Sequence, residues 1–93
     1  MPPIRRRVVW DADAVADLAA LLDYTPAAAR EAFEGFLHMA EMGFNLGRQV
    51  AHGRWYIPYS KVGVFYTDDG HQMVVVGMVD ARTLRELPKR ELR

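Results

Sequence analysis

Apolar and polar positions follow a helical period over the first half of the chain. Between Val15 and Leu22 the apolar residues recur three and four positions apart, and Asp11 or Asp13 is suited to cap this segment. A second apolar stripe runs from Phe33 to Ala40, after a Thr-Pro pair typical of a helix start and before Gly43, typical of a helix end. The short connection between the stripes predicts an antiparallel helical hairpin.

Strand-like segments surround this hairpin. Four segments are rich in β-branched and aromatic residues, as strands are: Ile4–Trp10, Trp55–Tyr59, Val62–Thr67 and Gln72–Val79. An Asp-Gly pair between the last two predicts a tight hairpin turn. The segment 44–53, "FNLGRQVAHG", is predicted to be a loop, and the tail after residue 80 a short helix stopped by Pro88.

The strand patterns also predict which side chains are buried. The run "MVVVGMV" at residues 73–79 lacks polar alternation, which predicts a central strand buried on both faces. Side chains alternate across a strand, and we expect Trp55, Ile57 and Tyr59 to face the helices rather than Arg54 and Tyr56. The order of elements predicts an α+β fold: an N-terminal strand, a two-helix hairpin, then a three-stranded antiparallel sheet in a single domain, 1–93.

Composition excludes several classes of function. The 93 residues contain no cysteine, which excludes disulfides, thiolate metal sites and cysteine nucleophiles. No glycine-rich phosphate loop or nucleophile elbow occurs, and no two of the three histidines have metal-ligand spacing, so we expect neither cofactor nor metal. There is no signal-peptide pattern and no apolar run long enough to span a bilayer, so we expect a cytoplasmic protein without a membrane partner.

Charge is zero overall but unevenly distributed. The segment 11–42 carries seven acidic residues and one basic residue, whereas the segment 43–67 has no acidic residue. The basic residues of that second segment are Arg48, Arg54 and Lys61. A neutral sum can therefore hide a basic face set against acidic helices.

Two stretches resemble the RelE/ParE superfamily of bacterial toxins. "VVWDADAVADLAAL" is similar to the opening strand and first helix of that family, and "GRWYIPYSKVGVFYTDDGHQMVVVGMVDAR" is similar to its C-terminal sheet. The resemblance covers residues 7–87. It implies the toxin of a type II toxin–antitoxin system with a cognate antitoxin as partner. ParE-like members bind DNA gyrase, whereas RelE-like members cleave mRNA on the ribosome.

The chain departs from the nuclease pattern of this superfamily. The resemblance places two lysines of the nucleases at Tyr56 and Pro58, an arginine at Gly63 and a catalytic tyrosine near Leu87. Only the basic residue after the last strand remains, as Arg82. This favours a toxin that binds a macromolecular target over one that cuts RNA.

Three functions stay open. They are a toxin that binds its target, an mRNA-cleaving toxin with substituted catalytic residues, and a non-toxic binding or assembly protein; a homo-oligomer is compatible with each. The candidate binding residues are Arg48, Arg54, Tyr56, Tyr59, Lys61 and Arg82, because aromatic and basic side chains can stack on bases and neutralise phosphates. The candidate catalytic residues are Tyr56, His52 and Arg82. Ordinary alternatives are core packing for the aromatics and pairing of Arg82 with Asp80 or Glu86.

Overall fold

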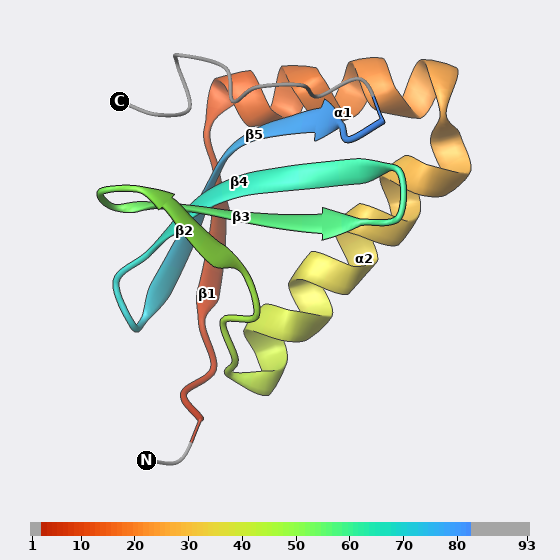
Figure 1. Ribbon diagram of the computed structural model, residues 1–93. Coiled ribbons are helices and arrows are strands. Elements are labelled where there is room, and N and C mark those ends of the chain that lie inside the picture. The colour runs from red at the N-terminus through yellow and green to blue at the C-terminus, as the bar shows by residue number, and fades with distance from the viewer. Residues whose placement is uncertain (1–2, 83–93) are drawn as a thin grey trace.

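The computed structural model describes residues 3–82 and packs two helices on one face of a five-stranded sheet (Figure 1). The elements follow the order β1 (Arg7–Trp10), α1 (Ala12–Tyr24), α2 (Pro26–Met42), β2 (Arg48–Ala51), β3 (Arg54–Tyr59), β4 (Val62–Asp68) and β5 (Gln72–Asp80). The strand order across the sheet is β1-β5-β4-β3-β2. β1 runs parallel to β5, and every other neighbouring pair is antiparallel.

The predicted α+β class and the helical hairpin are confirmed, but the predicted three-stranded sheet is wrong. β2 lies inside the segment that was predicted to be a loop, and β1 joins the same sheet beside β5. β2 is a four-residue edge strand with its first two residues exposed, so it carries little apolar signal. Its pairing with β3 comes from a tight turn in which Gly53 adopts a φ of 71°.

Helix ends lie where the local signals predict them. The Asp11 carboxylate accepts a hydrogen bond from the Ala14 N–H at 3.1 Å and caps α1. Pro26 begins α2, and Gly43 ends it in the left-handed conformation with a φ of 82°. Asp17, on α1, accepts a hydrogen bond from the Met78 N–H of β5 at 3.0 Å, so this carboxylate joins α1 to the sheet.

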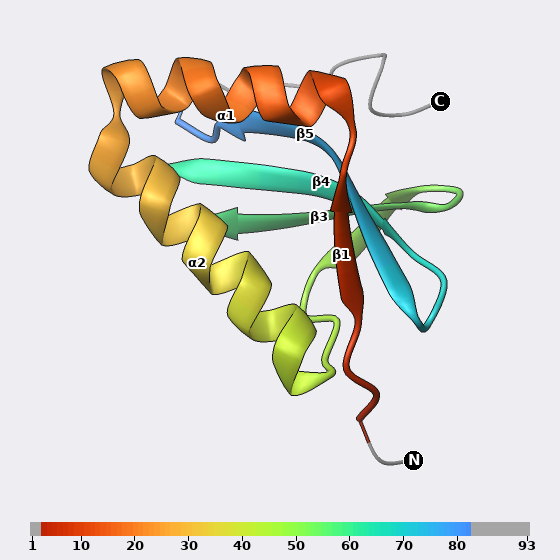
Figure 2. The same cartoon turned by 180° about the vertical axis from the view of Figure 1, so that it is seen from behind.

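The core forms between the helices and one face of the sheet (Figure 2). Trp55, Ile57 and Tyr59 contribute to it from β3, as predicted. The prediction that β5 is buried on both faces is wrong, because Val74 and Val76 are only half-buried while Met73 and Val75 are fully buried. The helices cover one face only, so burial alternates even along this apolar interior strand.

A buried polar network closes one end of the molecule. Arg6 pairs with Asp68 through Nε and Oδ1 at 3.2 Å, and the two side chains are 15% and 7% exposed. The same guanidinium donates to the Gly43 carbonyl at 2.7 Å, and the Asn45 amide donates to Asp68 at 2.9 Å. Asn45 in turn accepts from the Tyr66 hydroxyl. The network joins the segment before β1 to the end of α2 and to β4.

The predicted helix in the C-terminal tail lies outside the described residues. Within residues 3–82, neither helix is long and apolar enough to cross a membrane.

Candidate functional site

The sheet face opposite the helices carries three of the six predicted binding residues, Arg48, Arg54 and Tyr56. Arg48, Tyr56, Phe65 and Gly77 lie directly opposite one another on β2, β3, β4 and β5, and so form one row across the sheet. Side chains two positions apart share a face, so Arg54 and Pro58 belong to the same surface. We call this surface the outer face; Arg48, Arg54, Tyr56 and Pro58 from β2 and β3 lie on it with Gly63 and Phe65 from β4.

Tyr56 occupies the centre of the outer face and is closely packed. Its ring lies 4.7 Å from the ring of Phe65, centroid to centroid, and the two residues are 5% and 0% exposed. The ring also leans over Gly63: a Cβ added there would lie 2.1 Å from the Tyr56 hydroxyl oxygen and 2.4 Å from Cε1. The place of the Tyr56 ring therefore requires a glycine at position 63, and the two residues form one packing unit.

This packing determines the chemistry of the Tyr56 hydroxyl. Burial raises the pKa of Tyr56, and the positive charge of Arg48 only partly opposes the shift. A phenol with a raised pKa is neutral at physiological pH and is a poor general base. The geometry therefore favours a packing role for Tyr56 over a catalytic one.

Arg54 lies beside this cluster at the start of β3. Its side chain is half-buried, and its Nε is buried with no hydrogen-bond acceptor among the described residues. Buried guanidinium nitrogens are usually hydrogen-bonded. Arg48, by contrast, is exposed at the β2 edge. The two arginines place positive charge at one end of the outer face, where residues 43–67 contribute no carboxylate.

The remaining predicted basic residues lie at the other end of the sheet. Lys61 is in the β3–β4 turn, where its carbonyl accepts the Ala81 N–H at 2.8 Å, so Lys61 lies next to the end of β5. Arg82 follows β5 and forms two hydrogen bonds with the Asp80 carboxylate, from Nε at 3.0 Å and from Nη2 at 2.8 Å. Tyr24 of α1 donates to the same carboxylate.

This cluster holds Arg82 away from a phosphate-binding role. The Arg82 guanidinium and then the Tyr24 hydroxyl lower the pKa of Asp80, and the Asp80 carboxylate raises the pKa of Arg82. Asp80 therefore stays ionised and neutralises the one basic position that the nuclease pattern retains. A phosphate would have to compete with a bidentate carboxylate for this guanidinium.

Besides Lys61 and Arg82, two more predicted residues lie off the outer face. Tyr59 points toward α2, where a Cβ added at Gly35 would lie 2.6 Å from its ring, and burial raises the pKa of Tyr59 to about 12. His52 is exposed in the turn between β2 and β3. The structure therefore does not group Tyr59 or His52 with Tyr56. The candidate residues predicted from the sequence divide between the two ends of the sheet, except Tyr59, which packs against the core.

The pairing of Arg82 with Asp80 was one of the alternatives drawn from the sequence, and the structure shows it. Sequence reasoning missed the Tyr24 hydroxyl that donates to the same carboxylate, and the packing of Phe65 and Gly63 that determines the position of Tyr56. The packing could have been found from β-pairing, since it needs only the register of β3 and β4. The Tyr24 contact could not, because Tyr24 and Asp80 are 56 residues apart. No group of three or more His, Cys, Asp or Glu side chains suited to a metal occurs in residues 3–82.

Comparison with known proteins identifies the fold. The structure of a YoeB dimer from Staphylococcus aureus superposes with a TM-score of 0.59 at 12% identity, covering 78% of this chain and 93% of that one. The toxin–antitoxin complex RelBE2 from Mycobacterium tuberculosis gives a TM-score of 0.64 at 20% identity, covering 83% of this chain and 92% of the matched chain. No family model matches the sequence, and no curated protein matches it significantly. The chain therefore has the fold of RelE-family toxins.

Proposed function

We propose that this protein is the toxin component of a type II toxin–antitoxin system and acts by binding a macromolecular target in the cytoplasm. The fold supports the first part, because one of the similar structures is that of a toxin–antitoxin complex. The same complex supports an antitoxin as the partner of this chain.

The packing of Tyr56 over Gly63 supports binding rather than RNA cleavage. Both positions match basic residues of the nuclease pattern, and here they hold a buried aromatic ring and the glycine that makes room for it. The third such position, Pro58, has no side-chain charge, and Arg82 is neutralised by Asp80. A nuclease must stabilise the extra charge of a phosphorane-like transition state, and none of these four positions offers an unpaired cation for that task.

Arg48 and Arg54 supply the charge for target binding. They flank the aromatic centre, and the Arg54 Nε has no acceptor within residues 3–82. Arg48 is exposed and Arg54 is half-buried, so an anionic group of the target would pair with their positive charge through charge-assisted hydrogen bonds. No specific contact among residues 3–82 favours a second candidate function.

Expression of the chain alone in a bacterium, from a tightly controlled promoter, tests the proposal. We expect growth arrest that a co-expressed antitoxin reverses, and intact mRNA by primer extension. Arg48→Ala combined with Arg54→Ala should relieve the arrest, whereas Arg30→Ala, at an exposed position on α2, should not. Normal growth at good expression of folded protein would refute toxicity, and mRNA cut at discrete sites would refute binding without cleavage.

A further inference from the structure

One end of the molecule exposes a group of apolar side chains that the proposed function does not use. Ile4 comes from the segment before β1, Met42 ends α2, and Phe44 and Leu46 come from the segment that leads to β2. Both ribbon views place these segments together at the end of the molecule away from α1 (Figure 1 and Figure 2). We call these four side chains the apolar patch; they are half of the large apolar side chains that the described residues expose.

The way in which α2 ends brings the parts of the apolar patch together. The Phe44 N–H donates to the Met39 carbonyl at 3.3 Å, which reverses the chain after the helix. A Cβ added at Gly43 would lie 2.8 Å from both the Pro3 Cβ and the Ile4 backbone nitrogen, so the segment before β1 packs directly on this turn. Single exposed apolar side chains are common, whereas a contiguous group of them marks an interaction surface.

The polar groups beneath the apolar patch already have partners. The Arg6 guanidinium donates to the Ile4 and Gly43 carbonyls, each at 2.7 Å. Asp68 pairs with the same guanidinium and accepts a hydrogen bond from the Asn45 amide. Because these donors and acceptors are occupied within the chain, a partner can cover the patch without leaving one of them unpaired.

A hollow of about 370 Å³ lies beside the apolar patch. Ile4 and Phe44 line it, and the charged side chain in its lining is Arg6, which is paired as described above. Leu46 is not part of the lining but follows the lining residue Asn45, and it is 71% exposed. An exposed apolar side chain next to a hollow is self-complementary under a two-fold axis, because each copy supplies both parts.

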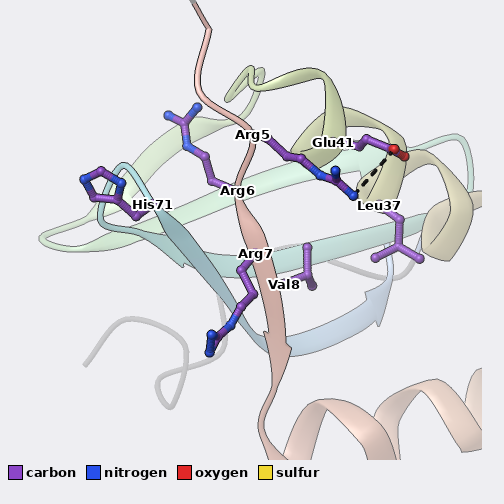
Figure 3. A pocket seen from close by; sticks show the side chains of 7 residues that line it. All are labelled: Arg5, Arg6, Arg7, Val8, Leu37, Glu41 and His71. Carbon is purple, nitrogen blue, oxygen red and sulfur yellow. Dashed lines mark ion pairs between the residues drawn. The ribbon is translucent and has the colours of Figure 1, made fainter.

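The charges at the border of the apolar patch have both signs. Arg5 follows Ile4 and extends toward Glu41, which precedes Met42, with 3.7 Å between Nη2 and Oε1 (Figure 3). Both charged side chains are mostly exposed, and such a surface pair contributes little within one chain. A second copy can therefore bring its Glu41 to Arg5 and its Arg5 to Glu41, so that opposite charges meet across the two-fold axis.

We propose that the apolar patch is an interface between two copies of this chain related by a two-fold axis. Leu46 of each copy would enter the hollow of the other, and the remaining side chains of the patch would be covered around it. A nucleic acid or a strongly acidic protein is disfavoured, because the charged side chain of the hollow, Arg6, already has a carboxylate partner.

The size of the apolar patch predicts a weak dimer. Standard protein interfaces use about 20–30 residues from each partner, and this patch with its border and hollow offers fewer. We therefore expect monomer and dimer to exchange in solution. The inference goes beyond the proposed toxin function and does not depend on it, because self-association is measured on the purified chain without a growth assay.

Sedimentation equilibrium of the purified chain over a range of concentrations tests the proposal. We expect a reversible monomer–dimer equilibrium, with concentration-dependent amide shifts in NMR spectra confined to residues 3–6 and 42–46. Leu46→Glu should weaken the dimer about tenfold or more, because the two-fold axis buries two unpaired carboxylates. Val15→Glu introduces the same charge at an exposed apolar position of α1 and should leave the dissociation constant within about twofold.

Two further measurements separate this interface from other associations. Added salt should change the dissociation constant by less than about threefold, because salt screens charges and leaves apolar contacts in place. A monomer at every concentration, a dimer that Leu46→Glu leaves intact, or amide shifts on another surface would each overturn the proposal. A chain that stays monomeric but sediments with vesicles of anionic phospholipid would also overturn it and assign the patch to a membrane surface. The amide shifts are measured on the unmodified protein, so the test does not depend on the variants folding.

Discussion

Gly63→Ala tests whether Tyr56 and Gly63 form one packing unit. An added Cβ would lie 2.1, 2.4 and 2.5 Å from Oη, Cε1 and Cζ of Tyr56, well inside van der Waals contact. The ring cannot move freely, because Tyr56 is 5% exposed and packs against the fully buried Phe65. Overpacking of this kind costs about 1–3 kcal/mol.

The backbone opposes this cost only in part. Alanine is favoured over glycine inside a strand by about 0.5–1 kcal/mol. We therefore expect Gly63→Ala to lower the free energy of unfolding by about 1–2 kcal/mol, measured by urea denaturation followed by circular dichroism. In a Tyr56→Val background the ring is gone, and the same substitution should be neutral or stabilising by about 0.5 kcal/mol.

The double-mutant cycle gives the decisive quantity. We expect a coupling free energy of about 2 kcal/mol between the two positions, within the range measured for residues in contact. A cost of Gly63→Ala that is the same in both backgrounds, or near zero in each, would refute the close packing of Tyr56 over Gly63. Confirmation would mean that Gly63→Arg cannot restore the nuclease pattern without displacing Tyr56.

Three further changes test other parts of the structure. The buried Tyr59 hydroxyl oxygen has no partner among the described residues, so Tyr59→Phe should stabilise the protein by about 1 kcal/mol in urea denaturation. Burial raises the pKa of Tyr59 to about 12, so the folded state keeps a proton that the unfolded chain loses above about pH 10. Wild-type stability should therefore fall as the pH rises from about 10 to 12, and less steeply in Tyr59→Phe; equal slopes would contradict this reasoning. Asp68→Asn leaves Arg6 without its carboxylate at a mostly buried site and should cost about 2–3 kcal/mol, and an unchanged urea midpoint would show that the pair is not needed. Arg82 and Tyr24 lower the pKa of Asp80, so its contribution to stability should be lost as the pH falls below about 4, and Asp80→Asn should lack this acid-side loss in a pH series of thermal unfolding.

The sequence by itself determined the local elements of this protein. Apolar spacing, the Asp11 cap, Pro26 and Gly43 specify both helices, because each signal acts between residues within a few positions of one another. Alternation along β3 likewise identified the side chains that face the helices, since a strand presents alternate residues to opposite faces. Helix signals and strand alternation act within short segments, so they can be recognised from the sequence of each segment alone.

Only the tertiary structure decided how the segments combine. β2 is an edge strand that depends on pairing with β3, and β1 joins β5 across more than sixty residues of chain, so neither shows in a local pattern. The outer face depends on strand pairing too: Tyr56 is recognisable as aromatic, but its packing depends on the register that sets Phe65 and Gly63 of β4 against β3. Arg82 is recognisable as basic, but its availability depends on Asp80 and on Tyr24 of α1. Side-chain chemistry is fixed by residue type, whereas burial and pairing depend on which distant residues the fold brings into contact.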